Sequence, residues 1–158
     1  MENNNCGMSD YSKDTKNNSD LHTRLLQPGQ KGTILIMDDE ESILIVTGKM
    51  LKILGYDVLC ARNGLEALLL FSEMHEKGTP VKGVIMDLII RGGIGGKAAM
   101  EALRQIDPAV KAIVSSGYSH DPIMADYRQY GFSGVLMKPY KFEDLCDSLQ
   151  KLMEQPAE

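Results

Sequence analysis

The sequence predicts an α/β domain in which helices cover both faces of a parallel β-sheet. Five short apolar runs alternate with five amphipathic segments between Thr33 and Met153, and such alternation is typical of parallel strands joined by right-handed crossovers. The chain has 158 residues, 43% of them hydrophobic, which suits one soluble domain. We find no internal sequence repeat, and we expect one domain and no second one.

The first 32 residues differ sharply from the rest of the chain. They include asparagine at positions 3, 4, 5, 17 and 18 and almost nothing apolar before Leu21. Such a segment buries too little surface to offset the entropy of ordering it. Leu21, Leu25 and Leu26 would share one face of a short helix, but Pro28 favours a flexible linker. We therefore expect a disordered polar tail or linker over residues 1–32, the folded domain over 33–154 and a short tail over 155–158.

The first half of the domain opens with a strand over residues 33–37 (TILIM) that ends at Asp38, Asp39 and Glu40. A helix over 41–54 follows, because its apolar residues recur at spacings of three and four and Gly55 is suited to its C-terminus. Residues 56–60 form the second predicted strand. Asn63 is a favoured N-cap for a helix that we expect over 63–76.

The third predicted strand is the apolar run that leads to Asp87. Val84, Ile85 and Met86 show no polar face, as expected for a central strand that is buried on both sides. The glycine-rich loop after Asp87 leads to a helix over 97–105, which ends before Pro108.

The last elements continue the alternation. We expect a strand over 110–115, a helix over 121–130, a strand over 133–137 and a helix over 141–153. Asp121 and Pro122 suit the N-cap and first turn of the helix over 121–130, and Gly131 suits its end. The two strands lead directly to Ser116 and Lys138.

Polar residues that carry chemistry follow four of the five predicted strands: Asp38 and Asp39, Asp87, Ser116 and Lys138. Parallel strands bring their carboxyl ends to one edge of the sheet, which is where ligands bind in open α/β folds. Carboxylates about 4 Å apart repel by roughly 4 kcal/mol at an intermediate dielectric constant. A divalent cation removes this conflict, and Mg²⁺ prefers such oxygen ligands together with a phosphate oxygen.

These residues suit phosphoryl chemistry. An aspartate alone after a strand is as often a simple turn residue, but here four strand ends agree. A carboxylate such as Asp87 can attack phosphorus and form an aspartyl phosphate. Lys138 supplies a compact positive charge for a phosphoryl oxygen or for a salt bridge with Asp87, and Ser116 supplies a hydroxyl donor.

Composition argues against several other classes of function. The net charge of -5 disfavours binding to nucleic acid, which needs clustered Lys and Arg. Cys6, Cys60 and Cys146 lack the spacing of a zinc site and are odd in number, so we expect a reducing, cytoplasmic setting. The sequence has no apolar run of the roughly 20 residues that span a bilayer and no signal peptide pattern; we expect no membrane partner.

Four segments resemble the signatures of the response-regulator receiver domain of two-component signalling: IMDDEESI, GVIMDLIIRGGIGG, VSSGYS and VLMKPY. The GGIGGK loop and the segment SSGYSHDPIMADYRQYGF are similar to receivers of hybrid sensor histidine kinases in particular. The resemblance covers residue 33 to about 154. It implies a flavodoxin-like (βα)5 fold, a doubly wound parallel sheet with strand order 2-1-3-4-5.

The resemblance also implies roles for individual residues. Asp87 would be the phosphoacceptor, Ser116 rather than Ser115 the switch hydroxyl, and Lys138 the site lysine, with Pro139 in a position that often has a cis peptide. The Mg²⁺ ligands would be Asp39, Asp87 and the backbone carbonyl of Ile89, with Asp38 acting through a water molecule. The domain would take its phosphoryl group from a phosphohistidine on a histidine kinase or a histidine phosphotransfer protein and then change its binding to a downstream protein partner.

The resemblance implies that the domain is not an enzyme acting on other substrates. It would catalyse only its own phosphorylation and a slow autodephosphorylation. We expect the latter to be slow because Ile89 and Tyr118 flank the route of the attacking water without polar side chains. Two positions depart from the family pattern: Arg91 stands where many members have proline, and Val135 where many have an aromatic residue.

Two alternatives remain at this stage. A phosphohydrolase of the haloacid dehalogenase type would need a second acid where this chain has Ile89. A pseudo-receiver would bind partners without phosphorylation.

Overall fold

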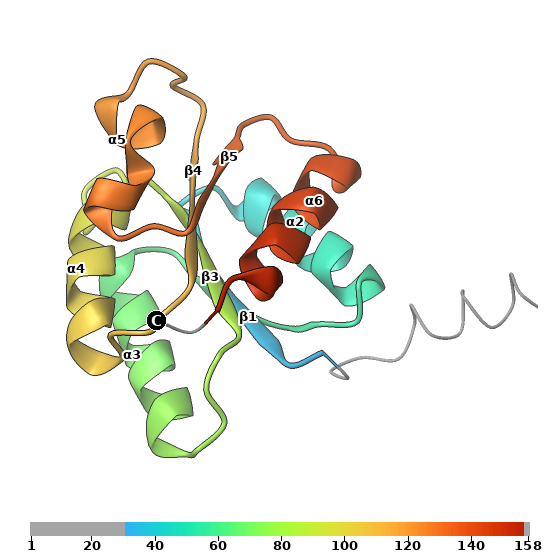
Figure 1. Ribbon diagram of the computed structural model, residues 1–158, viewed down its shortest axis with the longest axis vertical. Helices are drawn as coiled ribbons and strands as arrows, with labels where there is room; N and C mark the ends of the chain where they lie inside the picture. The colour runs from blue at the N-terminus through green and yellow to red at the C-terminus, as the bar shows by residue number, and fades with distance from the viewer. Residues whose placement is uncertain (1–30, 157–158) are drawn as a thin grey trace, which may run out of the picture.

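The computed structural model describes residues 31–156, which form a five-stranded parallel sheet with helices on both faces (Figure 1). The strand order is β2-β1-β3-β4-β5, which confirms the order 2-1-3-4-5. The strands are β1 (Thr33–Met37), β2 (Asp57–Ala61), β3 (Gly83–Asp87), β4 (Ala112–Ser116) and β5 (Gly134–Met137). Residues 1–30 of the predicted tail and residues 157–158 lie outside the described part.

The helices divide into two layers. They are α2 (Glu41–Ile53), α3 (Gly64–Glu76), α4 (Gly96–Ile106), α5 (Pro122–Ala125), the 3-10 helix η1 (Tyr127–Tyr130) and α6 (Phe142–Glu154). Figure 1 shows α2 and α6 on one face of the sheet and α3, α4 and α5 on the other. Among the described residues, no helix is long and apolar enough to cross a membrane.

The core consists of two apolar clusters separated by the sheet. Successive strand residues alternate between them because strand side chains point to opposite faces: Ile34 packs with α2 and α6, whereas Leu35 packs with α3 and α4. Every residue of β3 and β4 is buried, as expected for central parallel strands. The site residues at the ends of these strands are therefore held by a rigid layer.

The elements follow the predicted order, with small shifts at their ends. The strand predicted over 110–115 begins later, at Ala112, because the amide of Val110 closes a turn by donating to the carbonyl of Asp107. Asn63 caps α3 as predicted, and its side chain accepts a hydrogen bond from the amide of Glu66.

The largest difference is that the helix predicted over 121–130 is broken into α5 and η1. Its start is as predicted, with the Asp121 side chain accepting from the amide of Ile123, and Gly131 ends η1 with a φ of 87°. Asp126, between the two pieces, leaves the helical conformation with φ -127° and ψ 43°. Aspartate is a weak helix former because its short side chain favours turns, so helical periodicity did not extend through this position.

Candidate functional site

The site lies at the carboxyl edge of the sheet, where the predicted residues come together. Asp38 directly follows β1, Asp87 ends β3, Ser116 ends β4 and Lys138 directly follows β5. The register of the sheet pairs Asp87 with Ser115 and Ser116 with Met137. Residues that are far apart in the sequence thus become neighbours through the parallel strand order alone.

Three carboxylates form a compact cluster at this edge. Each of Asp38, Asp39 and Asp87 offers an oxygen, and these oxygens all lie within 4.8 Å of one another. Asp38 and Asp87 are buried, so their charges are poorly solvated. Clustered hard oxygen donors of this kind are the ligands that Mg²⁺ prefers. The donor set therefore fits a divalent cation.

The ammonium of Lys138 lies between two of these carboxylates. Its Nζ is 2.5 Å from Oδ2 of Asp38 and 3.2 Å from Oδ2 of Asp87. The side chain of Lys138 is only 13% exposed. The structure thus contains the predicted salt bridge with Asp87 and adds a shorter one with Asp38.

The pKa values at this cluster follow from burial and charge. Burial raises the pKa of Asp87 above its ordinary value, and the neighbouring charge of Lys138 only partly offsets this. Burial acts to lower the pKa of Lys138, but its hydrogen bond with Asp38 and the charges of both aspartates outweigh it, so that pKa is raised. Lys138 is therefore a fixed cation, whereas Asp87 is a carboxylate that lacks full compensation for its charge.

Backbone amides orient the three carboxylates. Asp38 Oδ1 accepts from the amide of Glu40 at 2.9 Å, Asp87 Oδ1 from Ile89 at 3.4 Å and Asp39 Oδ2 from Arg91 at 3.3 Å. Ile89 itself is 49% exposed. The loop after β3 therefore holds both Asp87 and Asp39 through backbone amides.

Two glycines let this loop pass close behind Asp87. A Cβ atom on Gly95 would lie 2.5 Å from the carbonyl oxygen of Leu88, and one on Gly96 would lie 2.8 Å from that of Asp87. The amide of Gly96 donates to the carbonyl of Leu88 at 3.0 Å. The glycine-rich segment thus allows a tight approach to the backbone at Asp87, because glycine has no side chain to obstruct it.

The two serines at the end of β4 differ in their environment. Ser116 is 1% exposed, and its Oγ accepts from the amide of Tyr118 at 3.1 Å, which leaves its hydroxyl proton free to donate. Oγ of Ser115 is buried and has no hydrogen-bond partner within the described residues. Tyr118 is 69% exposed.

Sequence reasoning missed a support for the Lys138 segment. The hydroxyls of Thr47 in α2 and Tyr140 lie 2.6 Å apart, and burial raises the pKa of Tyr140. Tyr140 follows the cis peptide between Lys138 and Pro139, so this bond ties the lysine segment to α2. The sequence offered one sign of this contact: Thr47 places a hydroxyl on the apolar face of α2, where a buried polar group needs a partner.

Comparisons with known proteins agree with this geometry. The family model described as "Response regulator receiver domain" matches residues 34–150. The chain is 28% identical over 123 residues to the sensor kinase CckA of Brucella abortus, covering 78% of this chain and 13% of that protein. It is 26% identical over 120 residues to the sporulation initiation phosphotransferase F of Bacillus subtilis, covering 76% of this chain and 92% of that protein.

A solved structure shows the same fold. The receiver domain of the sensor histidine kinase PA1611 from Pseudomonas aeruginosa, solved with a magnesium ion in its active site cleft, matches with a TM-score of 0.68 at 22% identity, covering 78% of this chain and 98% of that one. The chain thus spans a small part of the Brucella kinase and nearly all of the shorter relatives. Since the family model covers most of its length, the chain belongs to the response regulator receiver domains of two-component systems.

Proposed function

We propose that this domain accepts a phosphoryl group on Asp87 from a phosphohistidine and thereby changes its binding to a protein partner. The observation that carries the proposal is the position of Lys138 Nζ, bonded to Asp38 and Asp87 beside a third carboxylate, Asp39. This arrangement places a nucleophilic oxygen, a fixed cation and metal ligands around one point where a phosphoryl group would sit.

Each residue of the site would have a separate role in phosphoryl transfer. Asp39, Asp87 and the backbone carbonyl of Ile89 would hold Mg²⁺ directly, and Asp38 would do so through water. The ion would neutralise charge on the phosphoryl oxygens during transfer. An oxygen of Asp87 attacks phosphorus, the new O–P bond forms as the P–N bond of the donor breaks, and the imidazole nitrogen leaves with the electron pair. Lys138 and Ser116 then bind phosphoryl oxygens.

The donor is a histidine kinase or a histidine phosphotransfer protein. Relatives named sensor kinase and phosphotransferase support this choice. We place the exchange in the cytoplasm, because the exposed Cys60 is a free thiol that suits a reducing compartment.

The phosphorylated state would change the surface formed by α5, β5 and α6. Ser116 and Lys138 end or follow the two strands beneath that surface, and both would move toward the new phosphoryl oxygens. Val135 in β5 has no aromatic ring to rotate, so we propose a shift of loop and strand. A phosphohydrolase is not favoured, because the half-exposed Ile89 offers no second acid.

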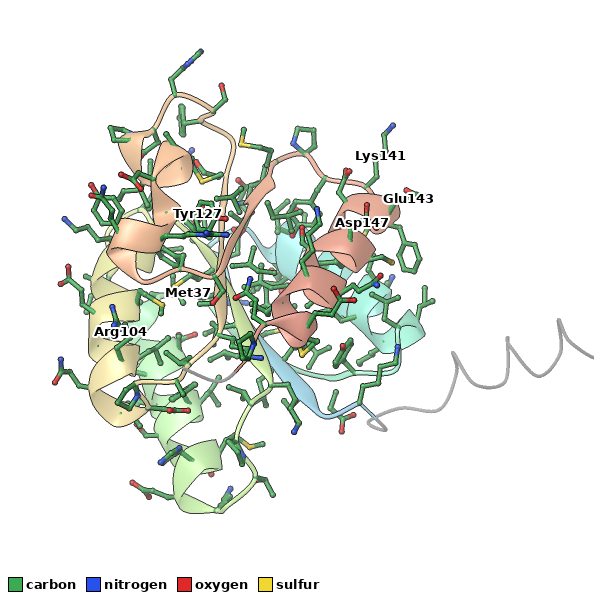
Figure 2. The ribbon with its side chains drawn as sticks, viewed as in Figure 1. Met37, Arg104, Tyr127, Lys141, Glu143 and Asp147 are labelled. Atoms are coloured by element: carbon green, nitrogen blue, oxygen red, sulfur yellow. The ribbon has the colours of Figure 1, made fainter. Side chains whose placement is uncertain are left out.

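The test is to incubate the protein with acetyl phosphate and Mg²⁺ and measure its intact mass. The wild type should gain one phosphoryl group, and Asp87→Asn should gain none while keeping its fold, since the two side chains are nearly isosteric. Asp147→Asn is the matched control, because Asp147 is an exposed aspartate on α6 (Figure 2). Full modification of the Asp87 variant would refute the assignment.

A further inference from the structure

The opposite edge of the sheet contains a cavity of about 400 Å³. Its walls come from the end of α4, the segments that lead into β4 and β5, the end of η1 and the residues after α6. It lies among the amino ends of the strands, away from the aspartate cluster. A volume of this size falls within the range of about 300–1,000 Å³ that is usual for small-molecule sites.

The charges that line this cavity have one sign. Arg104, Lys111 and Arg128 contribute to its wall, and within residues 31–156 no carboxylate lines it. Neither arginine takes part in an ion pair in the described part of the chain. In a chain with a net charge of -5, three cations gathered around one cavity without an acid require a physical reason, because like charges repel.

Local contacts hold the two arginines in place. Arg104 packs on Gly131, where a Cβ atom would lie 2.8 Å from Nη1, so the absence of a side chain lets the guanidinium approach the backbone. The guanidinium of Arg128 lies 5.7 Å from the ring centre of Tyr127; Figure 2 marks both Arg104 on α4 and Tyr127 in η1. Preorganised guanidinium groups lose less entropy when they bind an anion.

Polar groups complete the wall. Nζ of Lys111 donates to the carbonyl oxygen of Gln155, and Nε2 of Gln155 donates to the carbonyl of Ser133. These bonds fix the lysine at the cavity and satisfy two carbonyl oxygens that would otherwise repel an anion. The lysine retains further N–H donors for a ligand.

We propose that this cavity binds a small phosphate-bearing anion through Arg104, Lys111 and Arg128. Two guanidinium groups and one ammonium match a ligand with at least two negative charges, and guanidinium groups bind phosphate oxygens in a bidentate manner. A bound diphosphate group would join η1 to α4 and to the end of α6. The site is independent of the phosphorylation of Asp87, so either proposal can fail alone.

Calorimetric titration with pyrophosphate tests the proposal. It is done in low salt and with a chelator, which prevents binding through Mg²⁺ at the aspartate cluster. The wild type should bind one pyrophosphate per chain, and Arg104→Gln or Arg128→Gln should weaken binding at least tenfold, because each removes charge-assisted hydrogen bonds. Arg62→Gln is the matched control, since Arg62 is an exposed arginine that pairs with Glu41 elsewhere on the surface.

A parallel titration with adenosine diphosphate distinguishes two possible ligands that carry a diphosphate group, a nucleotide and the inorganic anion. Tighter binding of the nucleotide would assign a nucleoside diphosphate, and tighter binding of pyrophosphate would assign the inorganic anion; both outcomes support the site. Amide NMR spectra of each variant verify the fold, and the amide of Gly131 should shift on titration of the wild type. Absence of binding to the wild type at millimolar pyrophosphate would overturn the proposal, and so would wild-type affinity in both arginine variants.

Discussion

The two edges of the sheet carry opposite charge. At the carboxyl edge, Asp38, Asp39 and Asp87 lie within 4.8 Å of one another with Lys138 among them. At the amino edge, three cations line one cavity, and within the described residues no acid lines it. Both edges therefore contain clustered charge that the protein does not fully neutralise.

The direction of the helices explains this difference. Each crossover runs from the carboxyl end of one strand to the amino end of the next, so helix N-termini gather at the carboxyl edge and C-termini at the amino edge. The helix dipole favours anions near the former and cations near the latter. Arg104 and Arg128 indeed lie in the last turns of α4 and η1. The polarity of the fold thus favours acids at one edge and bases at the other.

The largest expected effect that tests the contrast between the acidic and basic edges is a change in Mg²⁺ affinity. Asp39→Ala should lower Mg²⁺ affinity at least about tenfold, since even residues that only support metal ligands are worth 10–100-fold. The double variant Arg104→Gln, Arg128→Gln should leave Mg²⁺ affinity unchanged. Calorimetric titration with MgCl₂ measures both. If the arginine variant altered Mg²⁺ binding as much as Asp39→Ala, the two edges would be coupled and the contrast would fail.

The two edges also differ in how far the sequence predicts them. Asp38, Asp87, Ser116 and Lys138 each end or directly follow an apolar run, so the rule that parallel strands share one carboxyl edge was enough to bring them together. The strand order itself came from the family resemblance.

The amino-edge cavity and the support of Lys138 were not predicted. The cavity depends on where α4, η1 and α6 end, and Arg128 lies in η1, after the break at Asp126 that the sequence did not predict. The bond between Thr47 and Tyr140 joins residues 93 positions apart. Periodicity specifies which face of a helix is buried, but not which buried hydroxyls meet.

A second test concerns the unbalanced charge of Asp87. Burial raises its pKa, so without Mg²⁺ the folded state binds a proton more tightly than the unfolded chain. The resulting stabilisation is present at low pH and is lost as the pH rises from the unfolded value of 3.8 through the raised folded value. Asp87→Asn should therefore exceed the wild type in unfolding free energy at pH 7, because the variant carries no charge at this buried position.

Urea unfolding in a chelating buffer at several pH values measures this difference. The wild type and Asp87→Asn should converge toward pH 4, and saturating Mg²⁺ should stabilise the wild type much more than the variant. A wild type that is the more stable of the two at pH 7 without Mg²⁺ would show that Lys138 fully compensates the charge of Asp87.

The smallest expected effect concerns the hydrogen bond between Thr47 and Tyr140, which supports the Lys138 segment at the carboxyl edge. Thr47→Val and Tyr140→Phe should each lower the unfolding free energy by about 1 kcal/mol. Each substitution removes one hydroxyl of the hydrogen bond and leaves the other without a partner. The double variant should lose less than the sum, since the bond is lost only once. If the effects on stability were additive, the two hydroxyls would not be bonded in solution. If the bond positions Lys138, both single variants should also slow phosphorylation by acetyl phosphate. Mg²⁺ affinity should change little, because backbone amides of Glu40, Ile89 and Arg91 orient the three carboxylates directly.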